Sequence, residues 1–166
     1  MKYFFLLMST LLIGFSSAAQ QTQHAYLQYR TVPAARLLLA DSSGKELKAM
    51  LDKKKPLMIV VFSPECDHCK QEAEELTRNM DKFKNIQIMM ISMQPLHQIN
   101  EFVSRYNLGK YKNIIVGRDY AYILPVYYDI KSLPFHAFYN KEKQLITALE
   151  GTMTIEKILA QFGLKK

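Results

Sequence analysis

The two cysteines of this chain, Cys66 and Cys69, are separated by Asp67 and His68. They stand where a continuous apolar run, residues 57–62, gives way to a stretch with helical periodicity. Unpaired backbone N–H groups and the positive end of the helix dipole stabilise a thiolate at the start of a helix. We therefore expect a redox dithiol whose nucleophile is Cys66.

The second cysteine begins an apolar face of the expected helix. Apolar residues follow it in steps of three or four positions, at Ala73, Leu76, Met80 and Phe83. This period places Cys69 on the inward face of the helix. We expect Cys69 to be the shielded thiol, which resolves the mixed disulfide formed by its partner.

Glu72 lies one turn after Cys69, at the edge of the same helix face. A carboxylate there should be partly desolvated and can accept the Cys69 proton during resolution. The alternative is an ordinary exposed glutamate, because Glu74 and Glu75 follow directly and edge positions are often solvated.

Two structural roles of the cysteine pair compete with redox chemistry. A zinc site needs four ligands, and His24, His97 and His136 are far apart with no short ligand spacing. A purely structural disulfide between positions i and i+3 would close too short a loop to restrict the unfolded chain much. We expect redox chemistry with no metal and no cofactor.

The first nineteen residues resemble a secretory signal in their physical pattern. Lys2 is followed by an apolar run, residues 4–15, and by small residues at positions 17–19. Such a core is short for a membrane span. We expect cleavage after residue 19 and a chain soluble in the periplasm or cell envelope, whereas an uncleaved signal would act as an N-terminal anchor.

Length and charge limit the remaining possibilities. Residues 20–166 suit one domain with a proper core. The formal net charge of +7 is only mildly basic, and the lysine runs at 53–55 and 165–166 lack interleaved aromatic residues. We expect a monomer with no nucleic-acid partner.

Apolar runs and breaker residues predict alternating strands and helices after a lead-in segment, residues 20–35. The runs at 57–62 and 86–91 are continuous, which indicates strands buried on both faces. The order predicts an α/β fold with a central mixed β-sheet flanked by helices. The expected strands are 36–40, 57–62, 86–91, 114–116, 135–139 and 144–149, and the expected helices are 66–83, 96–106, 120–127 and one after Gly151.

A strand that leads into a CxxC helix, followed by a Pro-led hairpin and a terminal helix, resembles the thioredoxin superfamily. The additional helix, strand and helix between residues 91 and 133, an N-terminal turn and the signal are similar to its envelope branch, the TlpA/ResA-like proteins. The resemblance covers residues 36–163 and is most specific at residues 63–72. There Glu72 matches the acidic residue that those proteins carry three positions after the second cysteine.

This resemblance implies a thioredoxin-like domain over residues 36–166, with a central helix-strand-helix insertion, and thiol-disulfide oxidoreductase activity. In thioredoxins a cis-proline faces the dithiol, and the residue before it offers backbone groups to a bound peptide. Leu133 and Pro134 are the expected substrate-binding pair, unless Pro134 is a trans proline that opens an edge strand. The implied partners are disulfide-bearing envelope proteins and, for a reductase, a membrane electron donor.

Departures from the family pattern affect the redox properties. Glu65 replaces the usual tryptophan before the first cysteine, and Val60 replaces the buried aspartate of cytoplasmic thioredoxins. Asp67 and His68 replace the usual Pro-containing pair. His68 as a cation stabilises the thiolate and Asp67 opposes it, so the direction of electron flow stays open, although the resemblance favours a reductant.

Three other functions fit parts of the pattern. A peroxiredoxin would match at Ser63, three residues before Cys66, but has a proline where this chain has Ile59. The second alternative function is that of a binding module whose dithiol carries out no reaction. The third is a thioredoxin-fold copper chaperone, with ligands drawn from Cys66, Cys69, His136, Met89, Met90 and Met93. Known copper relatives, however, space their cysteines one residue wider.

Overall fold

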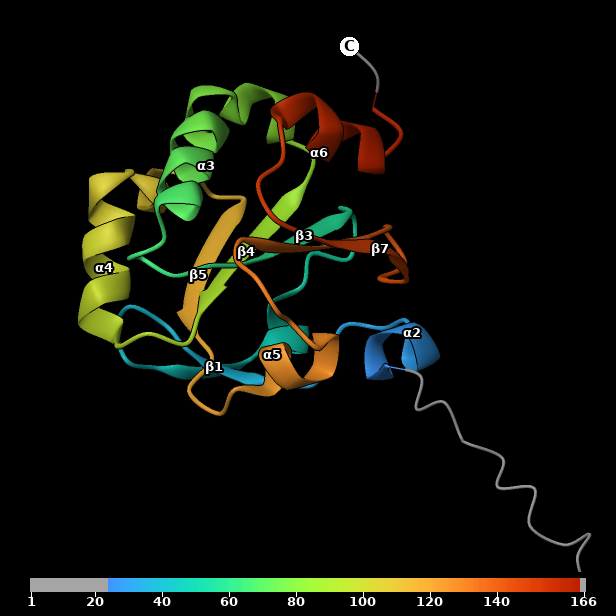
Figure 1. Ribbon diagram of the computed structural model, residues 1–166, viewed down its shortest axis with the longest axis horizontal. Helices are drawn as coiled ribbons and strands as arrows, with labels where there is room; N and C mark the ends of the chain where they lie inside the picture. The colour runs from blue at the N-terminus through green and yellow to red at the C-terminus, as the bar shows by residue number, and fades with distance from the viewer. Residues whose placement is uncertain (1–23, 165–166) are drawn as a thin grey trace, which may run out of the picture.

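A seven-stranded mixed β-sheet forms the centre of the computed structural model, which describes residues 24–164 (Figure 1). The signal segment expected at residues 1–19 lies outside the described residues. The strands are ordered β2-β1-β5-β4-β3-β6-β7. Their bounds are β1 Arg36–Leu38, β2 Gly44–Glu46, β3 Leu57–Val61, β4 Gln87–Ser92, β5 Ile114–Arg118, β6 Phe135–Tyr139 and β7 Leu145–Glu150.

Helices cover both faces of this sheet (Figure 1). On one face lie α3, α4 and α6, and on the other lie α2 and α5. The bounds are α2 Ala25–Tyr29, α3 Asp67–Arg78, α4 Leu96–Arg105, α5 Ile123–Tyr128 and α6 Ile155–Gln161. This arrangement confirms the predicted α/β fold with a mixed sheet flanked by helices.

Strand β3 supplies side chains to the two cores that these helices enclose. Met58 and Val60 belong to the core under α3, α4 and α6, whereas Leu57, Ile59 and Val61 belong to the core on the opposite face. All five are buried, as the continuous apolar run predicts. Strand β3 is parallel to β4 and antiparallel to β6, so its carboxyl end lies beside the beginning of β6.

Several elements differ from their predicted bounds. Helix α3 ends at Arg78, and a separate 3₁₀ helix, Met80–Phe83, continues the buried face. Strand β2 was not predicted, because its sequence Gly-Lys-Glu has no apolar alternation, and it is held by pairing with β1. In the lead-in segment, α2 forms and Thr31 pairs with Gln144.

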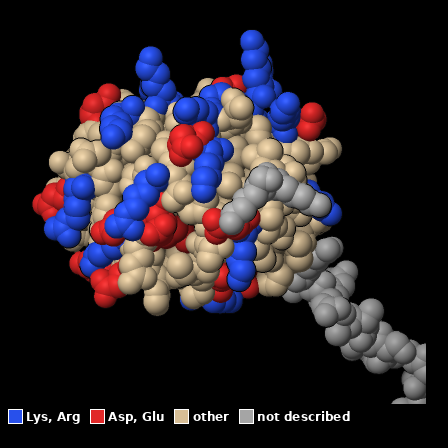
Figure 2. Space-filling model, turned by 90° about the horizontal axis from the view of Figure 1, so that it is seen from above, with Lys and Arg blue, Asp and Glu red and all other residues tan. Residues whose placement is uncertain are grey.

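Charged side chains of both signs are interspersed over the face seen in Figure 2. Among residues 24–164, no helix combines the length and the apolar character needed to cross a membrane.

Candidate active site

Cys66 is the N-cap residue of α3, and its position follows from the turn between β3 and that helix. The Cys66 N–H donates to the Ser63 carbonyl at 3.1 Å, which closes the turn. The Cys66 Sγ accepts the backbone N–H of Cys69 at 3.3 Å, so it occupies the place of a capping oxygen. A sulfur held there faces the free N–H groups and the positive end of a twelve-residue helix.

Cys66 is the more accessible thiol and Cys69 the shielded one, as the sequence predicts. Cys66 is partly exposed, whereas Cys69 is 2% exposed, and both are free cysteines. Burial raises the pKa of the Cys69 thiol, and the neighbouring Cys66 sulfur and the Glu72 carboxylate raise it further. Cys69 therefore keeps its proton at neutral pH and needs a base before it can act as a nucleophile.

The loop before β6 brings Leu133 and Pro134 to the dithiol. The Leu133 carbonyl oxygen lies 3.9 Å from Cys66 Sγ and accepts from the thiol. The peptide bond between Leu133 and Pro134 is cis. The fold thus places Leu133 directly beside the accessible sulfur and Pro134 at a cavity that Cys69 also lines.

Glu72 is buried more deeply than its position at the edge of the helix face indicated. Its side chain is 6% exposed, and its Oε1 lies 2.5 Å from Nε2 of His136. Its Oε2 accepts the backbone N–H of Met153 at 3.4 Å. The alternative of an ordinary exposed glutamate is wrong for Glu72 and correct for Glu74 and Glu75, which are exposed and pair with Arg78.

His136 is a site residue that the sequence analysis considered only as a possible zinc or copper ligand. It is 0% exposed and lies on β6 directly opposite Val60 of β3. The signal that could have found it is the alternation of the strand, since Pro134, His136 and Phe138 are spaced two apart and share one face. That face is the one covered by α3.

A small cavity joins the buried members of the site. Its volume is about 10 Å³, close to the smallest space that holds one water molecule. Cys69, Glu72 and Pro134 line it, together with apolar side chains of the core. The buried thiol and the buried carboxylate therefore face a common space.

The residues between the cysteines point outward. Asp67 and His68 are both exposed. Lys70 donates to the Asp67 carboxylate at 2.8 Å, and this contact lowers the Asp67 pKa. Because Lys70 partly compensates the Asp67 charge, the opposition of Asp67 to a Cys66 thiolate is weaker than its sequence position indicates.

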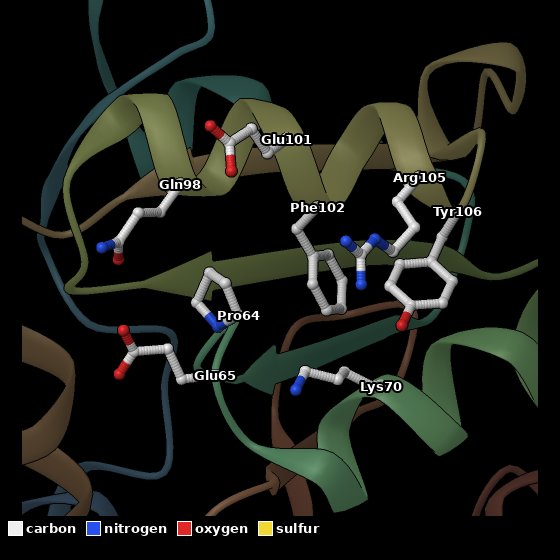
Figure 3. Close-up of a pocket in the computed structure, with 8 residues that line it drawn as sticks. All are labelled: Pro64, Glu65, Lys70, Gln98, Glu101, Phe102, Arg105 and Tyr106. Atoms are coloured by element: carbon white, nitrogen blue, oxygen red, sulfur yellow. The ribbon is translucent and has the colours of Figure 1, made fainter.

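A groove of about 320 Å³ lies beside the two residues that precede Cys66. Pro64 and Glu65, which immediately precede Cys66, line it from one side, and Lys70 of α3 and residues of α4 line it from the other. Figure 3 shows Phe102 between Pro64 and Arg105. The groove thus combines apolar side chains with charged side chains of both signs.

No metal-binding group of three or more His, Cys, Asp or Glu side chains exists within residues 24–164. Met89 belongs to the core on the face of the sheet opposite to Cys69, and Met93 packs against that same core, whereas Met90 lies in the core of Cys69 and lines the small cavity with it. The methionines considered as copper ligands are thus divided between the two faces of the sheet.

The comparisons agree with the class that this geometry defines, a thioredoxin-like oxidoreductase fold. The model of the AhpC/TSA family matches residues 30–157, and the chain belongs to that family. This match and the shared fold are consistent with a TlpA/ResA-like member of the thioredoxin superfamily. No sequence among the curated proteins matches the chain.

Solved structures share the fold at low sequence identity. A secreted Mycobacterium tuberculosis disulfide oxidoreductase homologous to E. coli DsbE has a TM-score of 0.63 and 19% identity, covering 76% of this chain and 92% of that one. StoA from Bacillus subtilis has a TM-score of 0.59 and 16% identity, covering 79% and 98%. Peroxidoxin BcpB from Mycobacterium tuberculosis has a TM-score of 0.65 and 13% identity, covering 79% and 92%.

Proposed function

We propose that this chain is a thiol-disulfide oxidoreductase of the cell envelope that reduces protein disulfides through Cys66 and Cys69. The observation that carries the proposal is the difference in exposure and surroundings between the two cysteines. Cys66 is accessible and caps α3 beside the Leu133 carbonyl, whereas Cys69 is buried and shares a cavity with Glu72.

The first step uses the accessible sulfur. The Cys66 thiolate attacks one sulfur of a substrate disulfide, so that a bond forms between them while the substrate S–S bond breaks and its other sulfur leaves as a thiolate. Leu133 and Pro134 lie where they can align the substrate backbone beside Cys66. The groove along Pro64 and Phe102 extends the surface available to the substrate polypeptide.

The second step needs the buried residues. Cys69 loses its proton to Glu72, directly or through one water molecule in the cavity, and attacks Cys66 Sγ. The bond between Cys66 and the substrate sulfur breaks, and the substrate leaves with two reduced sulfurs. Cys66 and Cys69 end as a disulfide, because the two electrons that reduce the substrate come from this pair.

The charge near the buried thiol supports electron flow from the protein to the substrate. A buried carboxylate beside Cys69 makes the thiolate forms of the pair costlier, which favours a reductant. A reductant in an oxidising compartment needs a membrane electron donor that reduces its disulfide again. The envelope location is supported by the signal pattern of residues 1–19 and by the likeness to a protein described as secreted.

Peroxide reduction is the second candidate, because the AhpC/TSA family match and the fold shared with a peroxidoxin favour it. Against it stands Ile59, a buried residue of β3 at the position where a peroxiredoxin has proline.

The test measures both reactions with the same purified protein. Under excess dithiothreitol, the wild-type protein should accelerate the reduction of insulin disulfides, and Cys66→Ser and Cys69→Ser should each abolish the acceleration. Hydrogen peroxide consumption should stay at the rate of the reductant alone. Rapid peroxide consumption that depends on Cys66, without insulin reduction, would contradict this proposal and show that the protein is a peroxidase.

A further inference from the structure

Glu72 lies between two spaces on different sides of the protein interior. One is the inner cavity that it shares with Cys69. The other is an open groove of about 700 Å³ between α3 and the segment that leads into α6, lined also by Thr152, Met153 and Glu75. Glu72 thus lines both the cavity of the buried thiol and a groove open to solvent.

The groove beside α6 is separate from the groove beside Cys66. Successive residues of an α-helix are rotated by about 100°, so positions 70 and 72 point to nearly opposite sides of α3. Lys70 lines the groove next to Pro64 and Glu65, whereas Glu72 lines the groove next to Met153. A substrate bound over Cys66 would therefore leave the Glu72 side of the helix uncovered.

His136 determines how the Glu72 carboxylate is held. Both carboxylate oxygens have a partner, Oε1 with His136 Nε2 and Oε2 with the Met153 N–H. The other ring nitrogen, Nδ1, has no partner among the described residues. A buried N–H without an acceptor is costlier than a buried acceptor without a donor, so the proton belongs on Nε2, which donates to Glu72.

We propose that His136 is the residue that positions Glu72, the proton outlet of Cys69. The inference rests on the proposed function. During resolution the S–H bond of Cys69 breaks and an O–H bond forms on Glu72. Glu72 then passes this proton to water in the groove between α3 and α6, while the substrate still covers Cys66. His136 keeps its own proton and acts only through Glu72.

The charged and titratable groups around Glu72 enter any pH dependence of this step. From α3 they are Cys69, Glu74, Glu75 and Arg78, with Cys66 at the helix start, from β6 His136, and from α6 Glu156. Glu75 pairs with Arg78 at 2.7 Å on the exposed surface. The exposed residues of this list are the same in every variant below, so they affect the pH dependence of all the variants equally.

The test follows the two chemical steps separately in the purified protein. Reduced protein is mixed with an aromatic disulfide that releases coloured thionitrobenzoate. The first release reports the attack by Cys66, and the second reports resolution by Cys69. At pH 7, Glu72→Gln should slow the second release about 100-fold, the lower range for loss of a general base. His136→Phe should slow it about 10-fold, as expected for loss of one hydrogen bond to a charged group.

Conservative variants and a double variant test whether His136 acts through Glu72. His136→Gln carries an amide N–H of similar reach and should restore most of the rate. His136→Asn is too short and should behave like the Phe variant, which covers the case in which the latter fails to fold. The double variant Glu72→Gln, His136→Phe should be no slower than Glu72→Gln alone. The rate of the second release should also rise more steeply with pH in the slow variants.

Ile88→Val, a buried change on β4, is the matched control and should leave both releases unchanged. A normal second release in His136→Phe and His136→Asn, or a double variant slowed by the product of the single effects, would overturn the inference about His136. A normal second release in Glu72→Gln would overturn the outlet itself. Absence of any second release in the wild-type protein would instead contradict the proposed function.

Discussion

Replacing the partners of the buried Glu72–His136 pair, singly and together, should give strongly coupled effects on the free energy of unfolding. In Glu72→Leu the His136 Nε2–H loses its acceptor in a site that is 0% exposed, which costs about 1–3 kcal/mol. In His136→Leu the carboxylate keeps only the Met153 N–H as partner, and the loss of this hydrogen bond to a charged group costs about 1.5–3 kcal/mol. The double variant removes both polar groups and should lie within about 1 kcal/mol of the wild-type protein.

The measurement is urea-induced unfolding of the reduced protein, with the free energy of unfolding extrapolated to water. Glu75→Leu is the matched control, because Glu75 is exposed and its ion pair with Arg78 contributes at most about 1 kcal/mol. Additive losses in the double variant would show that the two side chains do not depend on one another. Losses below about 0.5 kcal/mol in both single variants would refute the buried contact itself.

The remaining predictions concern the thiols. Alkylation of the reduced protein should modify the partly exposed Cys66 first and Cys69 only after unfolding, and preferential labelling of Cys69 in native protein would reverse their roles. Cys69→Ser should accumulate mixed disulfides with substrate proteins on non-reducing gels while Cys66→Ser does not, and equal trapping by both would contradict the order of attack. Because burial raises the Cys69 pKa above its ordinary value of 9.0, the folded state retains a proton that the unfolded chain loses. Stability of the reduced protein should therefore fall as pH rises above about 9, and more steeply than in Cys69→Ala, which shares the alkaline titration of the tyrosines. Identical slopes for the two proteins in urea unfolding at several pH values would exclude this contribution.

The parts of the site that follow a local period could be predicted from the sequence. Steps of three and four residues identify the inward face of α3, and Cys69, Ala73 and Leu76 are all buried there. The continuous apolar run of β3 indicates burial on both faces, which positions the start of α3 at the carboxyl end of a central strand. These features depend on residues close in the chain, so their pattern is visible without the fold.

The parts that depend on distant pairing could not be predicted. Glu72 is buried because the segment at Met153 packs over it and donates to it, and nothing near Glu72 in the sequence indicates that contact. His136 reaches Glu72 because the register of β6 on β3 places it opposite Val60. A lone histidine in a strand, 64 residues away from its partner, gives no local pattern that identifies this pair.

The equilibrium reduction potential of the Cys66–Cys69 couple tests the central claim most directly. Purified protein is equilibrated with glutathione buffers of defined ratio, and the fraction of reduced dithiol is measured by thiol labelling. We expect a single two-electron transition near the thioredoxin value of about −270 mV, lost in Cys66→Ser and in Cys69→Ser. A potential near about −120 mV would contradict a reductant and indicate disulfide formation, and the absence of a two-electron transition would contradict the redox dithiol itself.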